Sequence, residues 1–121
     1  MAKLMIGVPY LTGEDVNPDG SLKPYVGNGK AVVLMMQGNF CPHCTTAKPA
    51  FQQLVQGNGF AVATVQTDGD DGDREAAKKL ASVNKSPGVP AFLGFDKNGR
   101  FVKMHQGNRD VASLQAFGNS L

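Results

Sequence analysis

The sequence predicts an α/β fold, one domain built around a central mixed sheet of about four or five strands flanked by helices. From Lys30 onward, strand-like and helix-like segments follow in the order strand, helix, strand, helix, strand, strand, helix. The alternating part of this order is typical of parallel strands, and the two consecutive strands near the end are typical of an antiparallel hairpin. With 121 residues, of which 41% are hydrophobic, the chain is long enough to bury a substantial core.

Residues 1–29 are expected to form an irregular N-terminal wrap that belongs to the same domain as the core, residues 30–121. This stretch is rich in glycine and proline, which favour turns over regular elements. We expect at most one short strand in it, around Leu4 to Val8. The apolar residues within Met1–Pro9 are too few and too interrupted for a secretion signal, so a cytoplasmic protein is expected.

The first strand and the helix after it carry the only two cysteines of the chain. The run Ala31–Met36 is entirely apolar, as in a central parallel strand that is covered on both faces. This places Cys41 at the N-terminus of the following helix, where its sulfur should be accessible, and Cys44 one turn inside it on the covered side. The helix is predicted by apolar residues at helical spacing, which are Ala47, Phe51, Leu54 and Val55.

Two thiols in these positions predict a redox site. Backbone N–H groups and the positive end of the helix dipole favour the thiolate form of Cys41, which is the nucleophilic form. The imidazole of His43 would stabilise the same anion, and Pro42 fits the first turn because its missing N–H would have no partner there. We therefore expect Cys41 to attack and Cys44 to resolve.

Structural roles for the cysteines are weaker alternatives. A structural zinc site commonly has four Cys or His ligands, and only His43 and the distant His105 are available besides the cysteines. A purely structural disulfide closes a very small loop here and restricts the unfolded chain little. The acidic run Asp68–Asp73 lacks the ligand spacing of a calcium loop and is interpreted as the cap of the next helix. No metal and no separate cofactor are expected.

The middle elements follow in order. Phe60–Thr67 predicts the second strand, and Arg74–Val83 predicts an Ala-rich helix. Pro87–Pro90 then opens a strand over Ala91–Phe95, and Val89–Pro90 is the candidate for a cis peptide bond.

The last third of the chain predicts a hairpin and a helix. Asn98-Gly99 is typical of a tight turn and leads into the strand Arg100–Gln106. Asn108 is a candidate cap for the last helix. The residues of this helix that face the sheet would be Val111, Leu114, Phe117 and Leu121.

Outside the wrap, the chain resembles the thioredoxin family. Phe40–Cys44 is similar to the active-site motif of that family, Pro49 to the proline of the active-site helix, and Gly88–Pro90 to the cis-proline loop that faces the cysteines. Phe95–Gly99 is similar to the late hairpin, and Gly107 to the glycine near the substrate groove. The resemblance implies a three-layer thioredoxin-like fold. It also implies substrate contacts from Phe40, Val89, Pro90 and Gly107.

The resemblance further implies a thiol–disulfide oxidoreductase that reduces or exchanges protein disulfides through the redox-active Cys41–Cys44 pair, without another cofactor. Its partners would be protein disulfides and a reductant of the thioredoxin-reductase or glutathione type, and a monomer is expected. The formal net charge of +2 comes from dispersed residues, and no apolar segment has the length of a membrane span. Nucleic acid and membrane are therefore not expected partners.

The chain departs from the family in a buried pair of residues and in the dipeptide between the cysteines, and the dipeptide leaves the direction of electron flow open. Thioredoxins carry a buried Asp where this chain has Met35 and a Lys where it has Thr64. The base for Cys44 would then be His43, water or no group. The Pro-His dipeptide resembles that of periplasmic thiol oxidases, so an oxidase-like or isomerase-like activity is one alternative. A thioredoxin-like binding module without turnover is another.

Overall fold

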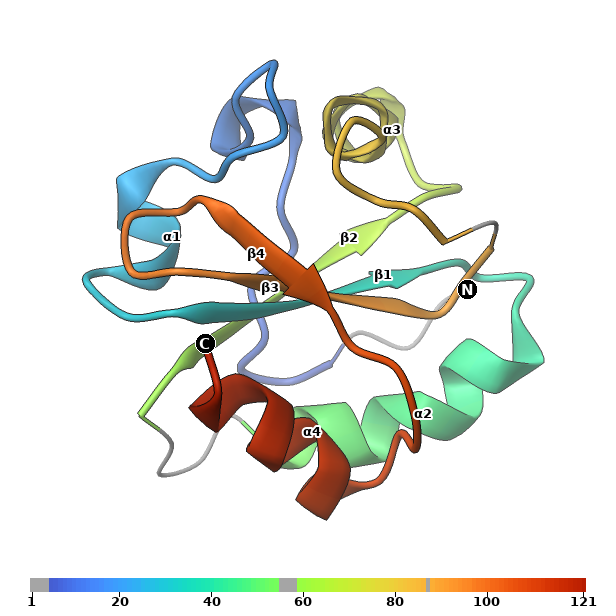
Figure 1. The fold of residues 1–121 in the computed structure, drawn as a ribbon. Helices are drawn as coiled ribbons and strands as arrows, with labels where there is room; N and C mark the ends of the chain where they lie inside the picture. The colour runs from blue at the N-terminus through green and yellow to red at the C-terminus, as the bar shows by residue number, and fades with distance from the viewer. Residues whose placement is uncertain (1–4, 55–58, 87) are drawn as a thin grey trace.

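The computed structural model describes residues 5–54, 59–86 and 88–121, with a mixed four-stranded sheet at the centre of the fold (Figure 1). The sheet has the order β2-β1-β3-β4, with β1 parallel to β2 and antiparallel to β3, and β3 antiparallel to β4. The predicted mixed sheet with a late hairpin is therefore confirmed. Its strands are β1 (Val32–Gln37), β2 (Ala61–Gln66), β3 (Ala91–Phe95) and β4 (Phe101–Met104).

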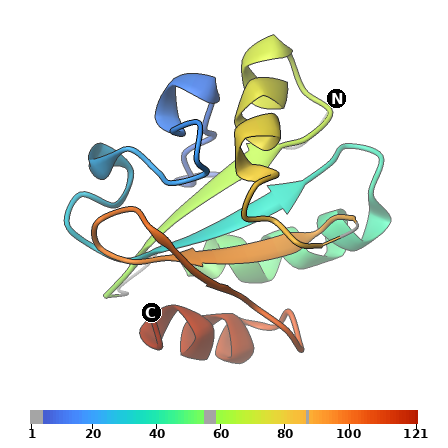
Figure 2. The same ribbon diagram turned by 45° about the horizontal axis from the view of Figure 1, so that its top comes forward.

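Helices cover both faces of the sheet, which gives the three predicted layers (Figure 2). α2 (Pro42–Gln53) and α4 (Val111–Asn119) lie on one face, and α3 (Asp71–Leu80) lies on the other. All six residues of β1 are buried, because successive side chains point to opposite faces and each face is covered. Those of Val33 and Met35 join the core with α2 and α4, and those of Val32, Leu34 and Met36 join the core with α3.

Residues 11–29 cover the same face of the sheet as α3, whereas Met5 and Val8 are buried in the core with α2 and α4. Residues 11–29 form a short 3-10 turn, η1 (Gly13–Asp15), and a single turn of helix, α1 (Pro24–Gly27). The Leu22 N–H donates to the carbonyl oxygen of Gly99 (2.8 Å), so this wrap is tied to the β3–β4 hairpin. Its apolar residues Leu11, Val16 and Leu22 are buried in the core on that face.

The strand expected around Leu4 to Val8 is not formed over Met5–Val8, and Leu4 lies outside the described residues. Gly7 has a φ of 79°, which is not a strand conformation, and Pro9 has no N–H to pair. Extended pairing begins only after them, where Tyr10 makes an isolated parallel bridge with Thr64 of β2.

The third helix begins earlier than predicted, at Asp71 rather than Arg74, and ends at Leu80 rather than Val83. A capping box sets its start, because Asp73 N–H donates to Asp70 Oδ1 (2.9 Å) and Asp70 N–H donates to Asp73 Oδ2 (3.1 Å). The interpretation of the acidic run as a helix cap is therefore confirmed.

The last helix is capped by Asp110 and not by Asn108. Ser113 N–H donates to Asp110 Oδ1 (2.7 Å), and a carboxylate is a better acceptor than an amide for this N–H. Two further boundaries also differ from prediction. β4 ends at Met104, before the predicted Gln106, and α2 ends at Gln53. Val55, at the end of the predicted motif helix, lies outside the described residues.

Candidate active site

Cys41 and Cys44 form a disulfide at the start of α2, directly after the loop that follows β1. Cys41 is the N-cap residue, Pro42 opens the helix, and Cys44 lies one turn inside it. Cys44 N–H donates to Cys41 Sγ (3.0 Å), so the sulfur takes the place of the oxygen that usually caps a helix. A sulfur that accepts a backbone N–H at a helix N-terminus is favoured as thiolate once the disulfide is reduced.

Cys41 is much less accessible than predicted. The residue is 5% exposed and Cys44 is 0% exposed, so both belong to the core on the α2 face. Cys41 Sγ lies 3.4 Å from the carbonyl oxygen of Val89, and the loop that carries Val89 covers it. The predicted order of exposure holds, but the prediction of an accessible Cys41 is wrong for the disulfide-bonded form.

The loop opposite the cysteines contains the cis peptide bond predicted for Val89–Pro90. Pro90 is buried at the start of β3, whereas Val89 is half-buried and packs against both cores. Pro90 also lines a hollow with Gly107, so the structure brings these two predicted residues together. Gly107 has a φ of 124°, a conformation that favours glycine.

The two remaining predicted residues, Phe40 and His43, are on the surface beside Cys41. Phe40 is 70% exposed, which is unusual for an aromatic side chain, and His43 is exposed on the first turn of α2. The stabilisation of a Cys41 thiolate by His43 stays a prediction. Pro49 lies inside α2, as the resemblance implies.

Met35 and Thr64, which stand where thioredoxins carry an acid and a base, are fully buried partners in the β1–β2 register. Thr64 Oγ1 donates to the Met35 carbonyl oxygen (2.7 Å) and accepts from Gln37 Nε2 (2.8 Å). Among the buried side chains of the described residues, only Gln37 Oε1 lacks a hydrogen-bond partner. Sequence reasoning missed Gln37, although a polar residue at the end of an apolar strand was a usable signal.

Asp68 is a second residue that sequence reasoning missed. It follows β2 and accepts Asn39 N–H with both carboxylate oxygens (3.0 and 2.9 Å), which fixes the loop before Cys41. Desolvation raises the pKa of Asp68, but hydrogen bonds from the Asn39 backbone and the Gln66 amide outweigh it and hold this pKa below its ordinary value. Burial lowers the pKa of Lys48 on α2, and the nearby Asp68 charge opposes that effect.

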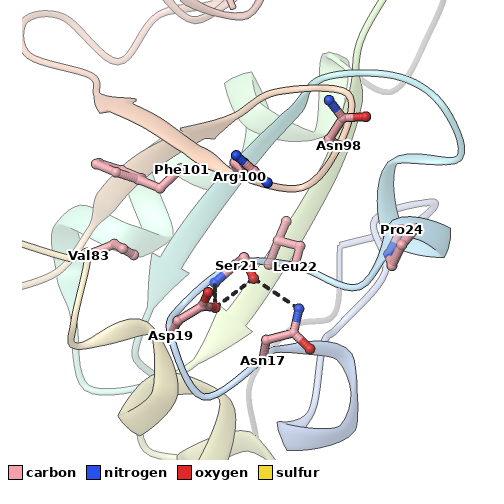
Figure 3. A pocket seen from close by; sticks show the side chains of 9 residues that line it. All are labelled: Asn17, Asp19, Ser21, Leu22, Pro24, Val83, Asn98, Arg100 and Phe101. Carbon is pink, nitrogen blue, oxygen red and sulfur yellow. Dashed lines mark hydrogen bonds between the residues drawn. The ribbon is translucent and has the colours of Figure 1, made fainter.

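A separate hollow lies where the wrap meets the β3–β4 hairpin (Figure 3). Asn17 Nδ2 donates to Ser21 Oγ (2.9 Å), and Ser21 Oγ donates to Asp19 Oδ1 (2.6 Å). Hydrogen bonds from the Ser21 side chain and backbone hold the pKa of Asp19 below its ordinary value. This hollow includes Arg100 of the hairpin, at the end of the sheet opposite the cysteines, so it is not part of their site.

Within the described ranges, no cluster of three or more His, Cys, Asp or Glu is placed to hold a metal ion. Nor does any described helix have both the length and the apolar character needed to cross a membrane.

Comparison with known proteins gives one consistent result. Residues 8–115 match the model of the AhpC/TSA family. The chain is 30% identical over 102 residues to the thioredoxin-like protein 453L of Invertebrate iridescent virus 6, and the match covers 73% of this chain and 70% of the viral protein.

Two solved structures show the same fold. A mutant thioredoxin from Halobacterium salinarum NRC-1 has a TM-score of 0.68 at 22% identity, covering 98% of this chain and 95% of that one. The J-Trx1 fragment of ERdj5 has a TM-score of 0.59 at 20% identity over 79% of this chain. The match spans only 45% of that fragment, so the similarity there concerns one part of a larger protein.

Proposed function

The chain belongs to the thioredoxin-like AhpC/TSA family, and from this premise we propose that it reduces or exchanges protein disulfides with the Cys41–Cys44 pair. The observation that carries the proposal is the position of Cys41 Sγ. It caps α2, accepts the Cys44 N–H at 3.0 Å, and is bonded to the one other cysteine of the chain. A pair in this position can exist as a thiolate nucleophile with a resolving thiol beside it.

The proposed reaction has two exchange steps. The Cys41 thiolate attacks one sulfur of the client disulfide, so a mixed disulfide forms and the other client sulfur leaves as a thiolate. Cys44 then gives up its proton and attacks Cys41 Sγ, which releases the second client thiolate and forms the Cys41–Cys44 disulfide. The client gains two electrons and the protein loses two. A reductant of the thioredoxin-reductase or glutathione type would restore the dithiol.

The direction of net electron flow depends on the stability of the reduced Cys41–Cys44 pair. The N–H donated to Cys41 Sγ stabilises a thiolate and so makes the disulfide more oxidising, and a protonated His43 would add to this. We propose a reductase or carrier in the cytoplasm whose potential is raised in this way, with an oxidase-like or isomerase-like activity as the alternative. A monomer suffices for this reaction because both cysteines come from one chain.

The near-complete burial of Cys41 beside the exposed Phe40 favours a second candidate, a binding module that holds a partner without turnover. Reduction of insulin disulfides by the wild-type protein and by Cys41→Ser and Cys44→Ser separates the two functions. An oxidoreductase loses turnover in both variants, and Cys44→Ser accumulates the mixed disulfide because the resolving thiol is missing. A binding module would show no turnover in the wild type and would keep its partner after Cys41→Ser.

A further inference from the structure

A hollow of about 350 Å³ lies beside the cysteines, on the side of the cis-proline loop. It adjoins the site through the cis-proline loop, because Pro90 lines it and the Val89 carbonyl oxygen, one residue earlier, lies 3.4 Å from Cys41 Sγ. We call it the basic hollow. Its lining includes Lys85, Pro90, Phe92, His105, Gly107 and Arg109.

The charged side chains that line the basic hollow are all positive. Lys85 and Arg109 are exposed at its rim, and none of the described residues that line it is acidic. The nearest acid along the chain, Asp110, caps α4 through Ser113 N–H and keeps its negative charge near His105. Lys85 and Arg109 together outweigh this single acid and leave the hollow with a net positive charge. His105 Nε2 donates to the Asn108 carbonyl oxygen (2.7 Å), which holds the imidazole on the hollow's wall and adds no negative charge.

Other acidic residues of the chain lie away from the basic hollow. Glu14, Asp70, Asp71 and Glu75 line a different hollow, between η1 and the start of α3. On the other side of Cys41, the Asp68 carboxylate lies under the loop that leads to Phe40. Asp68 is accompanied there by the Lys48 ammonium, whereas the charged side chains that line the basic hollow are all cations, so an anionic ligand would be attracted to the basic hollow.

A client segment that reaches Cys41 would bring its own side chains to the basic hollow. An extended segment rises about 3.3 Å per residue, and residues that differ by two positions point to the same side. A side chain near the client cysteine would therefore lie next to Pro90 and Gly107. A carboxylate there could pair with the Arg109 guanidinium, which binds carboxylates through two parallel hydrogen bonds.

We propose that the basic hollow selects client segments with an Asp or Glu close to the cysteine that forms the mixed disulfide. The inference rests on the proposed function, because it names the class of client that the same site reduces. Phe40, which is exposed next to Cys41 in the chain, would contact an apolar part of the client.

The test uses three disulfide-bonded peptides that differ only in the residues flanking one cysteine, which are Asp, Ser or Lys. The rate constant for reduction of each by the reduced protein is measured at low and at high ionic strength. We expect the Asp peptide to react about tenfold faster than the Lys peptide at low salt, with the Ser peptide between them. High salt should reduce this ratio, because exposed charges are screened.

Two double variants separate local charge from net charge. Lys85→Gln with Arg109→Gln should abolish the preference for the Asp peptide. Lys30→Gln with Lys97→Gln removes the same charge from exposed positions at the opposite end of the sheet and should keep the preference. If the Asp and Lys peptides react equally fast, or if both double variants lose the preference equally, the inference is overturned. Equal and rapid reduction of all three peptides would leave the proposed function standing, whereas no reduction of any peptide would overturn both.

Discussion

Two properties of Cys41, its position at the start of a helix and its burial, differ in how far the sequence alone predicts them. Its place at the start of a helix follows from the spacing of apolar residues after it, and the structure has it as the N-cap of α2. Its burial depends on Val89, which lies 48 residues away and approaches to 3.4 Å from the sulfur. A contact over that separation is set by the whole fold, so local patterns predicted the position of Cys41 at the start of the helix and missed its burial.

The Cys41 thiol of the reduced protein should have a pKa below the free-cysteine value of about 8.5, because Cys44 N–H and the helix N-terminus stabilise its anion. Thiolate absorbance against pH measures it. The Cys44→Ser variant leaves Cys41 as the only thiol, so the titration then belongs to one group. An apparent pKa at or above the free value would contradict the role of the helix cap.

Replacement of His43 tests whether its exposed imidazole acts on the thiolate. We expect His43→Gln to make the reduction potential more negative by about 10–20 mV, because a surface charge interaction is worth up to about 1 kcal/mol. His43→Lys keeps a positive charge at the same place and should keep most of the potential. Equilibration with glutathione measures the reduction potential of the wild type and both variants. Equal potentials would show that His43 has no electrostatic effect on the thiolate.

At the scale of elements, β1 and β2 are joined by a polar contact inside an otherwise apolar layer. Gln37 and Thr64 are both fully buried, and the hydroxyl of Thr64 is both acceptor and donor between them and Met35. The strands themselves could be predicted because each is a short apolar run. Which buried polar residue meets which depends on strand register, and a single sequence does not specify that register.

Thr64→Val should lower the free energy of unfolding by about 1–3 kcal/mol, because it removes the 2.8 Å acceptor of the buried Gln37 amide and leaves only the Tyr10 hydroxyl at 3.5 Å. Urea denaturation measures the change. Thr46→Val, the same substitution at an exposed position of α2, should change stability by less than about 0.5 kcal/mol. Adding Gln37→Met to Thr64→Val should recover part of the loss, since the buried amide is then removed. Additive losses in the double variant would contradict the coupling.

The contact between Asp68 and the loop before Cys41 predicts a dependence on pH. The pKa of Asp68 is held below 3.8 in the folded protein, so its contribution to stability is present above the unfolded value and is lost as the pH falls through the folded pKa. Asp68→Asn should therefore destabilise the protein by less than about 1 kcal/mol near neutral pH, since the group is partly exposed. The difference from wild type should shrink below about pH 4. A difference that grows in acid would have the wrong sign.

The first residues of α3 and α4 could not be predicted from the local sequence. The acidic run Asp68–Asp73 offers several possible caps. Asp70 is the cap in the structure because it forms a reciprocal pair of hydrogen bonds with Asp73 across the first turn. The start of α4 offers the same ambiguity between Asn108 and Asp110. In both cases the existence of the helix was predictable and its first residue was not, because neighbouring residues compete for the same N–H groups.

At the scale of the whole molecule, the sheet separates two cores that depend on different parts of the chain. The core under α2 and α4 contains both cysteines together with Met5 and Val8, and the core under α3 is closed by residues 11–29 of the N-terminal wrap. Sequence reasoning expected this wrap to be irregular but could not say what it covers. Its attachment to the hairpin includes a backbone hydrogen bond between Leu22 and Gly99, and backbone groups carry no sequence signal.

Gly99→Ala tests the attachment of the wrap. Gly99 has a φ of 84°, and a Cβ there would meet the carbonyl oxygen of Leu22. We expect a loss of at least about 1–3 kcal/mol in the free energy of unfolding, since the strained backbone and the displaced wrap act together. Gly29→Ala is the matched control, because Gly29 has a φ of 85° and nothing lies within 4 Å of the added Cβ.

The control should show the backbone strain alone, so the difference between the two variants measures the docking of the wrap on the hairpin. Because Gly99 lies at the end of the sheet opposite the cysteines, the folded fraction of Gly99→Ala should react with a disulfide peptide at the wild-type rate. Equal losses of stability in the two variants would show that the wrap contributes little at Leu22. A slower reaction per folded molecule would instead show that the two cores are coupled through the sheet, which shares β1 between them.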